Sequence, residues 1–202
     1  AATLKDGFTN PTKLKQRLGI HMRNSKDPYD TYSYIQHFSK NQKLEVLFFF
    51  LLGDYAQFDK NIRFDHPKMI SLIKQLGNTS TIGIHPSYAS NKNSKMIGIE
   101  KQRLEHILGK SVHHNRFHFL KFSLPKSYQQ LLAYGISDDY SMGYADQIGF
   151  RAGTCTPFNF YDLENEVQTD LKVHPFAYMD GVLKDHLKLN TEMACLLYTS
   201  PS

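Results

Sequence analysis

The sequence predicts an α/β protein built on a parallel sheet, and two observations lead to this prediction. Strand-like and helix-like patterns alternate along the chain, as they do when right-handed crossovers connect parallel strands. In addition, apolar strand-like runs break off into small polar clusters, and the carboxyl ends of parallel strands gather functional residues at one edge of a sheet. The four runs are Leu44–Leu52, Thr81–Ile84, Tyr134–Ile136 and Gly149–Phe150.

The first half of the chain alternates between helix and strand. Asp27-Pro28 predicts the start of a helix that runs to about Asn41, with proline in the first turn where its missing N–H is not needed. A strand follows at Val46–Leu52, apolar on both faces as a buried parallel strand is. Asp65-His66-Pro67 then begins a second helix, and Thr81–Ile84 forms the next strand.

The second half continues this alternation and then becomes mostly extended. Ser94–Leu108 carries one apolar stripe and ends at Gly109, which suits a left-handed helix cap. A strand is predicted around Arg116–Phe122 and a helix over Pro125–Ala133. Extended segments follow, and a last helix begins near Asn190; the extended segments are predicted at Ile136–Tyr144, Ile148–Ala152, Phe158–Tyr161 and Leu171–Met179.

Composition excludes several classes of protein. The 202 residues carry a net charge of +5, but Lys and Arg are mixed with Asp and Glu, which argues against a nucleic-acid-binding surface. The longest apolar run, Val46–Leu52, is too short to span a membrane. No GxGxxG or GxxxxGK[ST] motif follows a strand, which disfavours a nucleotide-binding sheet. Residues Ala1–Asn10 show no signal-peptide pattern, which favours a cytoplasmic location.

Histidine and arginine residues at predicted strand ends are the first candidates for a functional site. His85 ends a strand just before a proline, where it could ligate a metal or cap the following helix. Arg116 and His118 alternate along one predicted strand and so share a face, while Phe117 and Phe119 take the other. An inward Arg and His need a carboxylate or ligand partner, although an edge strand would leave them in solvent.

Carboxylates and aromatic residues complete the candidate set. Asp139, in the Asp-Asp-Tyr cluster, could serve in acid–base chemistry or form a turn. Arg151 could orient that carboxylate, bind a ligand or form a buried ion pair. Tyr88 and Tyr140 suit sugar recognition. We expect His85, Tyr88, Asp139 and Arg151 to meet in one groove at the carboxyl ends of the strands, with Asp54 at its rim.

Six short motifs in a fixed order resemble the bacterial polysaccharide deacetylase-like proteins, a divergent branch of the polysaccharide deacetylase superfamily. The resemblance covers about residues 14–190. The motifs are Phe48–Asp54, Gly83–Tyr88, Arg116–Leu120, Asp138–Ala145 with its Gly143-Tyr144-Ala145 end, Gly149–Thr154 and Met179–Gly181.

This resemblance implies a distorted (β/α) barrel that removes acetyl groups from a sugar polymer with the help of a divalent metal such as zinc. His85 matches the first metal-binding histidine of the family, but Ala89 stands where the second is expected. Arg116 corresponds loosely to the arginine of a third motif. The aspartates of the first strand and a late catalytic histidine fall outside the chain, so we expect a barrel truncated at both ends and an inactive fragment that binds metal weakly.

Two functions therefore stay open. One is a metal-dependent hydrolase that deacetylates a polysaccharide or glycan, with Asp139 and Arg151 as catalytic residues and His85 on the metal. Tyr88, Tyr140, Arg116, His118 and Asp54 would then bind the carbohydrate. The other is a non-catalytic carbohydrate-binding protein on the same fold. Residues 1–194 are expected to form one domain, and residues 195–202 a non-native tail.

Overall fold

The computed structural model of the chain describes residues 12, 15, 18–20, 22 and 27–199. The chain divides into two compact units, Ala1–Val46 and Leu47–Ser202. Helix α3 (Tyr32–Gln42) belongs to the first unit. It begins later than predicted, because the carboxylate of Asp27 accepts a hydrogen bond from the Tyr29 N–H at 2.9 Å and closes a turn around Pro28. The predicted single domain over residues 1–194 stays a prediction.

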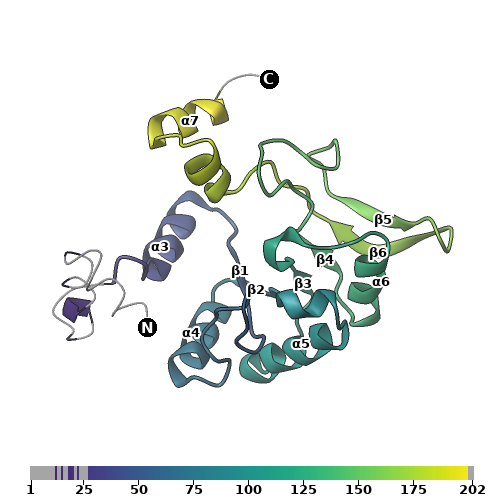
Figure 1. The fold of residues 1–202 in the computed structure, drawn as a ribbon, viewed down its shortest axis with the longest axis horizontal. Coiled ribbons are helices and arrows are strands. Elements are labelled where there is room, and N and C mark those ends of the chain that lie inside the picture. Colours follow the sequence, from purple (N-terminus) through teal and green to yellow (C-terminus); the bar gives the residue numbers. More distant parts are fainter. Residues whose placement is uncertain (1–11, 13–14, 16–17, 21, 23–26, 200–202) are drawn as a thin grey trace. The chain divides into compact units, whose positions relative to one another are not determined.

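The second unit is built on a sheet whose described strands follow the order β1-β2-β3-β4-β6-β5 (Figure 1). Strands β1 to β4 and β6 pair in parallel, as predicted, while β5 runs antiparallel to β6. Among the described strands β1 and β5 form the two edges, so the sheet is open and closure into a barrel is not confirmed. The strands are β1 (Leu47–Phe50), β2 (Thr81–Ile84), β3 (His114–Asn115), β4 (Asp138–Asp139), β5 (Phe158–Asp162) and β6 (Val167–Val173).

One row of side chains across the parallel strands forms the buried face of this sheet. Partners in register point to the same face of a sheet. Phe50, Ile84, Asn115, Asp139 and Val173 are in register across five strands, and all are buried. In the neighbouring row Phe49, His114 and Asp138 are half-buried and Lys172 is exposed, so the sheet has one covered face and one partly open face.

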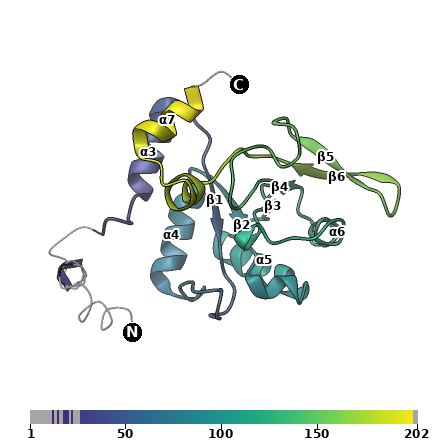
Figure 2. The same cartoon turned by 45° about the horizontal axis from the view of Figure 1, so that its top comes forward.

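Helices cover the buried face. Helices α4 (Pro67–Gly77), α5 (Lys95–Leu108) and α6 (Lys126–Ala133) lie on the same side of the sheet (Figures 1 and 2). Their buried side chains include Ile73, Leu76, Ile97, Leu104 and Leu131. Removing such apolar surface from water stabilises the fold by about 25 cal/mol per Å². Nothing among the described helices is both long and apolar enough to cross a bilayer.

The helix ends follow the sequence signals. His66 caps α4 by accepting a hydrogen bond on Nδ1 from the Lys68 N–H at 3.2 Å, and Pro67 occupies the first turn as predicted. Gly109 ends α5 with a φ of 69°, a left-handed conformation that glycine adopts without steric cost.

The predicted strand over Arg116–Phe122 is wrong. Strand β3 ends at Asn115, and a short 3-10 turn, η2 (His118–Leu120), replaces the expected extended segment. Phe119 and Leu120 there have φ values of 56° and 49°. Phe117 is buried whereas Phe119 is 58% exposed, so the predicted alternation of faces does not hold.

The extended segments in the last third are shorter than predicted or displaced. Ile136–Tyr144 contributes only β4, and Ile148–Ala152 forms no strand. Strand β6 begins earlier than expected and ends at Val173, and a π-helical turn, η3 (Val182–His186), follows. Helix α7 (Thr191–Thr199) continues past Cys195, where a loss of helical pattern was predicted. Ser200–Ser202 and Ala1–Asn10 lie outside the described residues.

Asp139 links several elements on the covered face of the sheet through hydrogen bonds. Its carboxylate accepts hydrogen bonds from Asn115 Nδ2 (2.6 Å), Tyr128 Oη (2.9 Å), Ser141 Oγ (2.8 Å) and Ser141 N (3.0 Å). Burial raises the pKa of Asp139, and these four hydrogen bonds oppose that rise. The carboxylate therefore joins β3, β4 and α6 through one fully buried acceptor.

We predict that Asp139→Asn destabilises the protein by about 2–4 kcal/mol, because the new amide N–H groups would face buried donors. Urea unfolding should show a lower midpoint with an unchanged slope. Asp170→Asn, at an exposed position of β6, is the matched control and should change stability by less than about 0.5 kcal/mol. An Asp139→Asn protein as stable as the parent would show that the network is not structural.

Candidate functional site

Polar side chains follow four parallel strands at the same edge of the sheet. His85 comes directly after β2, Arg116 after β3, Tyr140 after β4 and His174 after β6. Parallel strands bring their carboxyl ends to one edge. We call this set, with His118 and Asp138, the carboxyl-edge cluster.

Arg116 connects the members of this cluster. Its backbone N–H donates to Ile84 O at 3.0 Å, and its guanidinium Nη1 donates to Tyr140 O at 2.9 Å. The guanidinium carbon also lies 4.2 Å from the centre of the Phe176 ring. Burial lowers the pKa of Arg116, while the nearby carboxylates of Asp139 and Asp180 act in the opposite direction.

His85 and His118 form a pair of facing imidazoles. His85 Nδ1–H donates to the Arg116 carbonyl at 2.6 Å, and His85 Nε2 lies 2.9 Å from His118 Nδ1. The other nitrogen of His118, Nε2, donates to the Phe58 carbonyl at 3.1 Å and lies 3.9 Å from the buried carboxylate of Asp59.

The hydrogen bonds of this pair fix its charge. Both outer partners are carbonyl oxygens, which only accept, so each outer nitrogen must carry a proton. The hydrogen bond between the two rings needs a third proton, so the fully bonded pair has a charge of +1. Burial and the neighbouring His118 lower the pKa of His85 to about 4. His85 is therefore neutral near pH 7, and its Nε2 can only accept in the hydrogen bond between the two rings.

A second ionisable pair stands on the open face of the sheet. His174 Nε2 donates to Asp138 Oδ1 at 2.7 Å, and Ser137 Oγ donates to the other carboxylate oxygen at 2.7 Å. The Tyr140 ring stacks on the His174 ring with centres 4.3 Å apart and an interplanar angle of 5°. These hydrogen bonds lower the pKa of Asp138, although burial opposes them. The Asp138 carboxylate thus orients the His174 imidazole through Nε2, and Nδ1 is the ring nitrogen that does not bond to Asp138.

The structure brings only some of the predicted site residues together. His85, His118, Arg116 and Tyr140 lie in the carboxyl-edge cluster, and Tyr88 adjoins it, because its backbone N–H donates to Asp59 at 2.7 Å. These five positions lie at one edge of the sheet.

The other three predicted residues lie elsewhere. Asp139 points into the covered face and has no exposed surface. Arg151 is exposed, with its guanidinium 4.9 Å from the centre of the Phe122 ring, and it belongs to a turn rather than a strand end. Asp54 is exposed and pairs with Arg103 at 3.0 Å.

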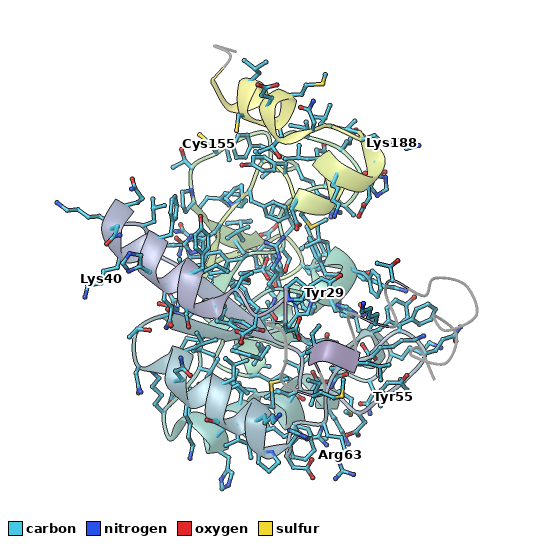
Figure 3. All side chains as sticks on the ribbon, turned by 90° about the vertical axis from the view of Figure 1, so that its left-hand side faces the viewer. Tyr29, Lys40, Tyr55, Arg63, Cys155 and Lys188 are labelled. Atoms are coloured by element: carbon cyan, nitrogen blue, oxygen red, sulfur yellow. The ribbon has the colours of Figure 1, made fainter. Side chains whose placement is uncertain are left out.

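A pocket of about 340 Å³ lies in the loop between β1 and α4, and neither the His85–His118 pair nor the His174–Asp138 pair lines it. Its lining includes Asp54, Tyr55 and Arg63, and the last two carry labels in Figure 3. Cys155, also labelled there, is exposed in the loop before β5.

Sequence reasoning missed Asp59 and His174 and gave no separate role to Asp138. A signal for His174 was present: His174-Pro175 repeats the His85-Pro86 pattern at the end of a strand. Asp59 gave no such signal, because it lies inside a loop and gains its position only from contacts with Tyr88 and His118.

A divalent metal fits this cluster only in part. The facing nitrogens of His85 and His118, with outer N–H groups on carbonyl oxygens, match the way histidine ligands are usually oriented. A catalytic zinc site normally takes three protein ligands, however. Within residues 27–199 and the few described before them, no group of three His, Cys, Asp or Glu side chains could hold a metal.

Comparisons with known proteins do not establish a family. No protein family model matches the chain, and no curated protein matches it. The solved structure of IcaB from Ammonifex degensii is similar over 57% of this chain and 56% of that one, with 14% identity and a TM-score of 0.41. The match thus spans little more than half the length of IcaB. A likeness at this level carries no argument about activity, and the predicted superfamily stays a prediction.

The low pKa of His85 makes stability depend on pH in a defined window. The folded-state pKa, about 4, lies below the usual value of about 6.5, so between these values the unfolded chain binds more protons. The stability that His85 contributes is complete above about pH 6.5 and is lost as the pH falls towards 4.

We predict that the free-energy difference between the parent and His85→Gln shrinks by about 2–3 kcal/mol between pH 6.5 and pH 4. Urea unfolding of both proteins across this range measures the difference. A difference that stays constant with pH would contradict the burial of a neutral His85.

Proposed function

We propose that the chain is a carbohydrate deacetylase that hydrolyses acetyl groups at the carboxyl-edge cluster. One observation carries the proposal: two ionisable pairs, His174–Asp138 and His85–His118, lie at one edge and are joined through Arg116 and Tyr140. Hydrolysis of an ester or amide needs one group to accept a proton and another to return it. The two pairs supply one group of each kind.

The reaction divides between these pairs. His174, oriented by Asp138 through Nε2, takes a proton from water on Nδ1 while the water oxygen attacks the acetyl carbonyl carbon. The charged guanidinium of Arg116 favours the negative charge that develops on the carbonyl oxygen. The bond from the acetyl carbon to the sugar oxygen or nitrogen then breaks, and His118 returns the proton of Nε2 to that leaving atom as its hydrogen bond to the Phe58 carbonyl breaks. The products are acetate and the free sugar hydroxyl or amine.

These two pairs also change the expectation of an inactive chain. That expectation rested on motifs absent from the sequence, whereas His174 lies outside all six motifs and forms an acid–base pair with Asp138. A divalent metal stays part of the proposal only as a ligand of His85 and His118, and no step above depends on it.

A non-catalytic carbohydrate-binding protein is the second candidate. The partial metal set favours it, because His85 and His118 provide two of the three ligands that a hydrolytic zinc site normally uses. This candidate predicts binding of acetylated sugars without release of acetate.

Acetate release decides between the two candidates. We predict that the purified chain releases acetate from one or more acetylated oligosaccharides in a panel of ester- and amide-linked substrates. Replacing the base in His174→Asn should lower kcat/KM by at least about 100-fold, the usual contribution of a positioned acid–base group. His106→Asn, an exposed histidine of α5, is the matched control and should retain the parent rate.

Binding without acetate release would contradict the hydrolase and support the binding protein. The same assay with added zinc and with a chelator tests the metal. Activity that requires zinc, together with one bound equivalent lost in His85→Ala, would establish a metal-dependent reaction.

A further inference from the structure

Three aromatic rings form an exposed corner beside the His85–His118 pair. Phe58 and Tyr88 lie against each other with ring centres 4.5 Å apart and an interplanar angle of 37°. Phe119 stands nearly perpendicular to both, at 90° to Phe58 and 85° to Tyr88, with centres 6.4 and 6.0 Å away. We call these three residues the aromatic corner: the Phe58 ring lies on the Tyr88 ring, and the Phe119 ring stands at about a right angle to both.

The rings of Phe58 and Phe119 in this corner are exposed to solvent rather than packed in the core. Phe58 is 47% exposed and Phe119 is 58% exposed. Phe119 also has a φ of 56°, a left-handed conformation that a bulky residue rarely adopts and that tends to occur at functional sites. Its neighbours impose this conformation, because Leu120 is buried and His118 is fixed by hydrogen bonds to His85 and Phe58.

Hydrogen bonds also join the corner to the ionisable pair. Phe58 accepts from His118 through its carbonyl, and Tyr88 donates its backbone N–H to Asp59, the carboxylate next to His118. The ring of Phe119 lies 4.3 Å from that of His118, centre to centre. A ligand bound at the corner therefore lies next to the His118 ring.

Lys121 places a positive charge beside the aromatic corner. Lys121 Nζ donates to the Tyr88 hydroxyl and lies 4.1 Å from the centre of the Tyr88 ring. An ammonium group has three N–H donors, so it can also donate to a ligand oxygen. Apolar rings next to a polar donor suit a ligand that has both a C–H face and hydroxyl groups.

We propose that the aromatic corner binds one pyranose ring of a glycan, with its C–H groups against the exposed surfaces of Phe58 and Phe119. Aromatic side chains offer a flat apolar surface of the size of one sugar ring, and the right angle at Phe119 sets the position of that ring along the chain of sugars. The inference deepens the proposed function, since it places a sugar ring beside the His85–His118 pair. The binding itself does not require the reaction to occur.

Binding to a glycan array tests this proposal directly. The probes are pyranose oligosaccharides in acetylated and non-acetylated forms, followed by calorimetry on those that bind. We expect Phe119→Ala to bind at least about tenfold more weakly, a loss that corresponds to about 1.4 kcal/mol. Tyr161→Ala is the matched control, because Tyr161 is 49% exposed on β5 in the hairpin, and its affinity should equal that of the parent.

A second variant reports the position of the ligand. The chain has no tryptophan, so Phe119→Trp places a single indole in the corner and keeps an aromatic face there. Its fluorescence should shift when a bound oligosaccharide is added, with an affinity close to that of the parent. The shift should persist in Phe119→Trp/His174→Asn, which separates binding from hydrolysis.

Each outcome has a defined meaning. If the parent protein releases no acetate but binds oligosaccharides with an affinity that depends on Phe119, the hydrolase is refuted and the aromatic corner stands as a sugar-binding site. Failure of every oligosaccharide to bind the parent, or equal affinity of a folded Phe119→Ala, would overturn the proposal. A fluorescence shift with phospholipid vesicles or an apolar peptide but with no sugar would also overturn it.

Discussion

The contacts of Arg116 hold the carboxyl edge of the sheet together. The backbone of this residue bonds to Ile84 on one side and to the His85 ring on the other, and its guanidinium reaches Tyr140 and the face of Phe176. Three segments that are far apart in sequence thus meet at Arg116, one containing Ile84 and His85, one Tyr140 and one Phe176. Arginine can do this because its planar group donates in several directions and stacks on a ring at the same time.

Two features of the sequence permit this arrangement. Gly143 has no side chain, and a Cβ atom there would lie within 2.6 Å of the Phe176 ring, so glycine lets that ring approach and cover Arg116. On the opposite face Asp139 gathers four hydrogen bonds and fixes β3 against β4. Its charge also lies near the buried guanidinium and helps to keep it protonated. Asp139 therefore supports the site from the covered face of the sheet.

The ionisable pairs follow from this geometry. Because Arg116 offers its carbonyl to His85, the second nitrogen of His85 points at His118, and the two outer carbonyl acceptors each require a proton. Because Tyr140 is held by the same guanidinium, its ring stacks on His174 beside Asp138. The His85–His118 pair and the oriented His174 imidazole thus share one edge, which is the arrangement on which the proposed hydrolysis rests.

Local patterns predicted many elements of the first two thirds, since strand β2 and helices α5 and α6 begin and end within about two residues of the predicted bounds, and α4 begins at the predicted Pro67. They failed at Arg116–Phe122, where alternating residues favoured a strand. Tertiary contacts of His118 and Leu120 imposed a turn there instead.

The candidate site was predictable only in outline. His85, Arg116 and Tyr140 follow strands and were found, whereas Asp59 and the His174–Asp138 pair depend on contacts between distant segments. Asp138 and Asp139 are adjacent in sequence, and only the register of β4 decides which of them faces the open side.

A crystal structure of the His174→Asn chain with an acetylated oligosaccharide tests the central claim most directly. The account predicts an acetyl group at the carboxyl edge, with the atom that links it to the sugar within about 2.6–3.2 Å of a His118 nitrogen, or one water away. The acetyl carbon should also face the position of the missing imidazole. An oligosaccharide bound elsewhere, with its acetyl groups out of reach of both positions, would contradict it.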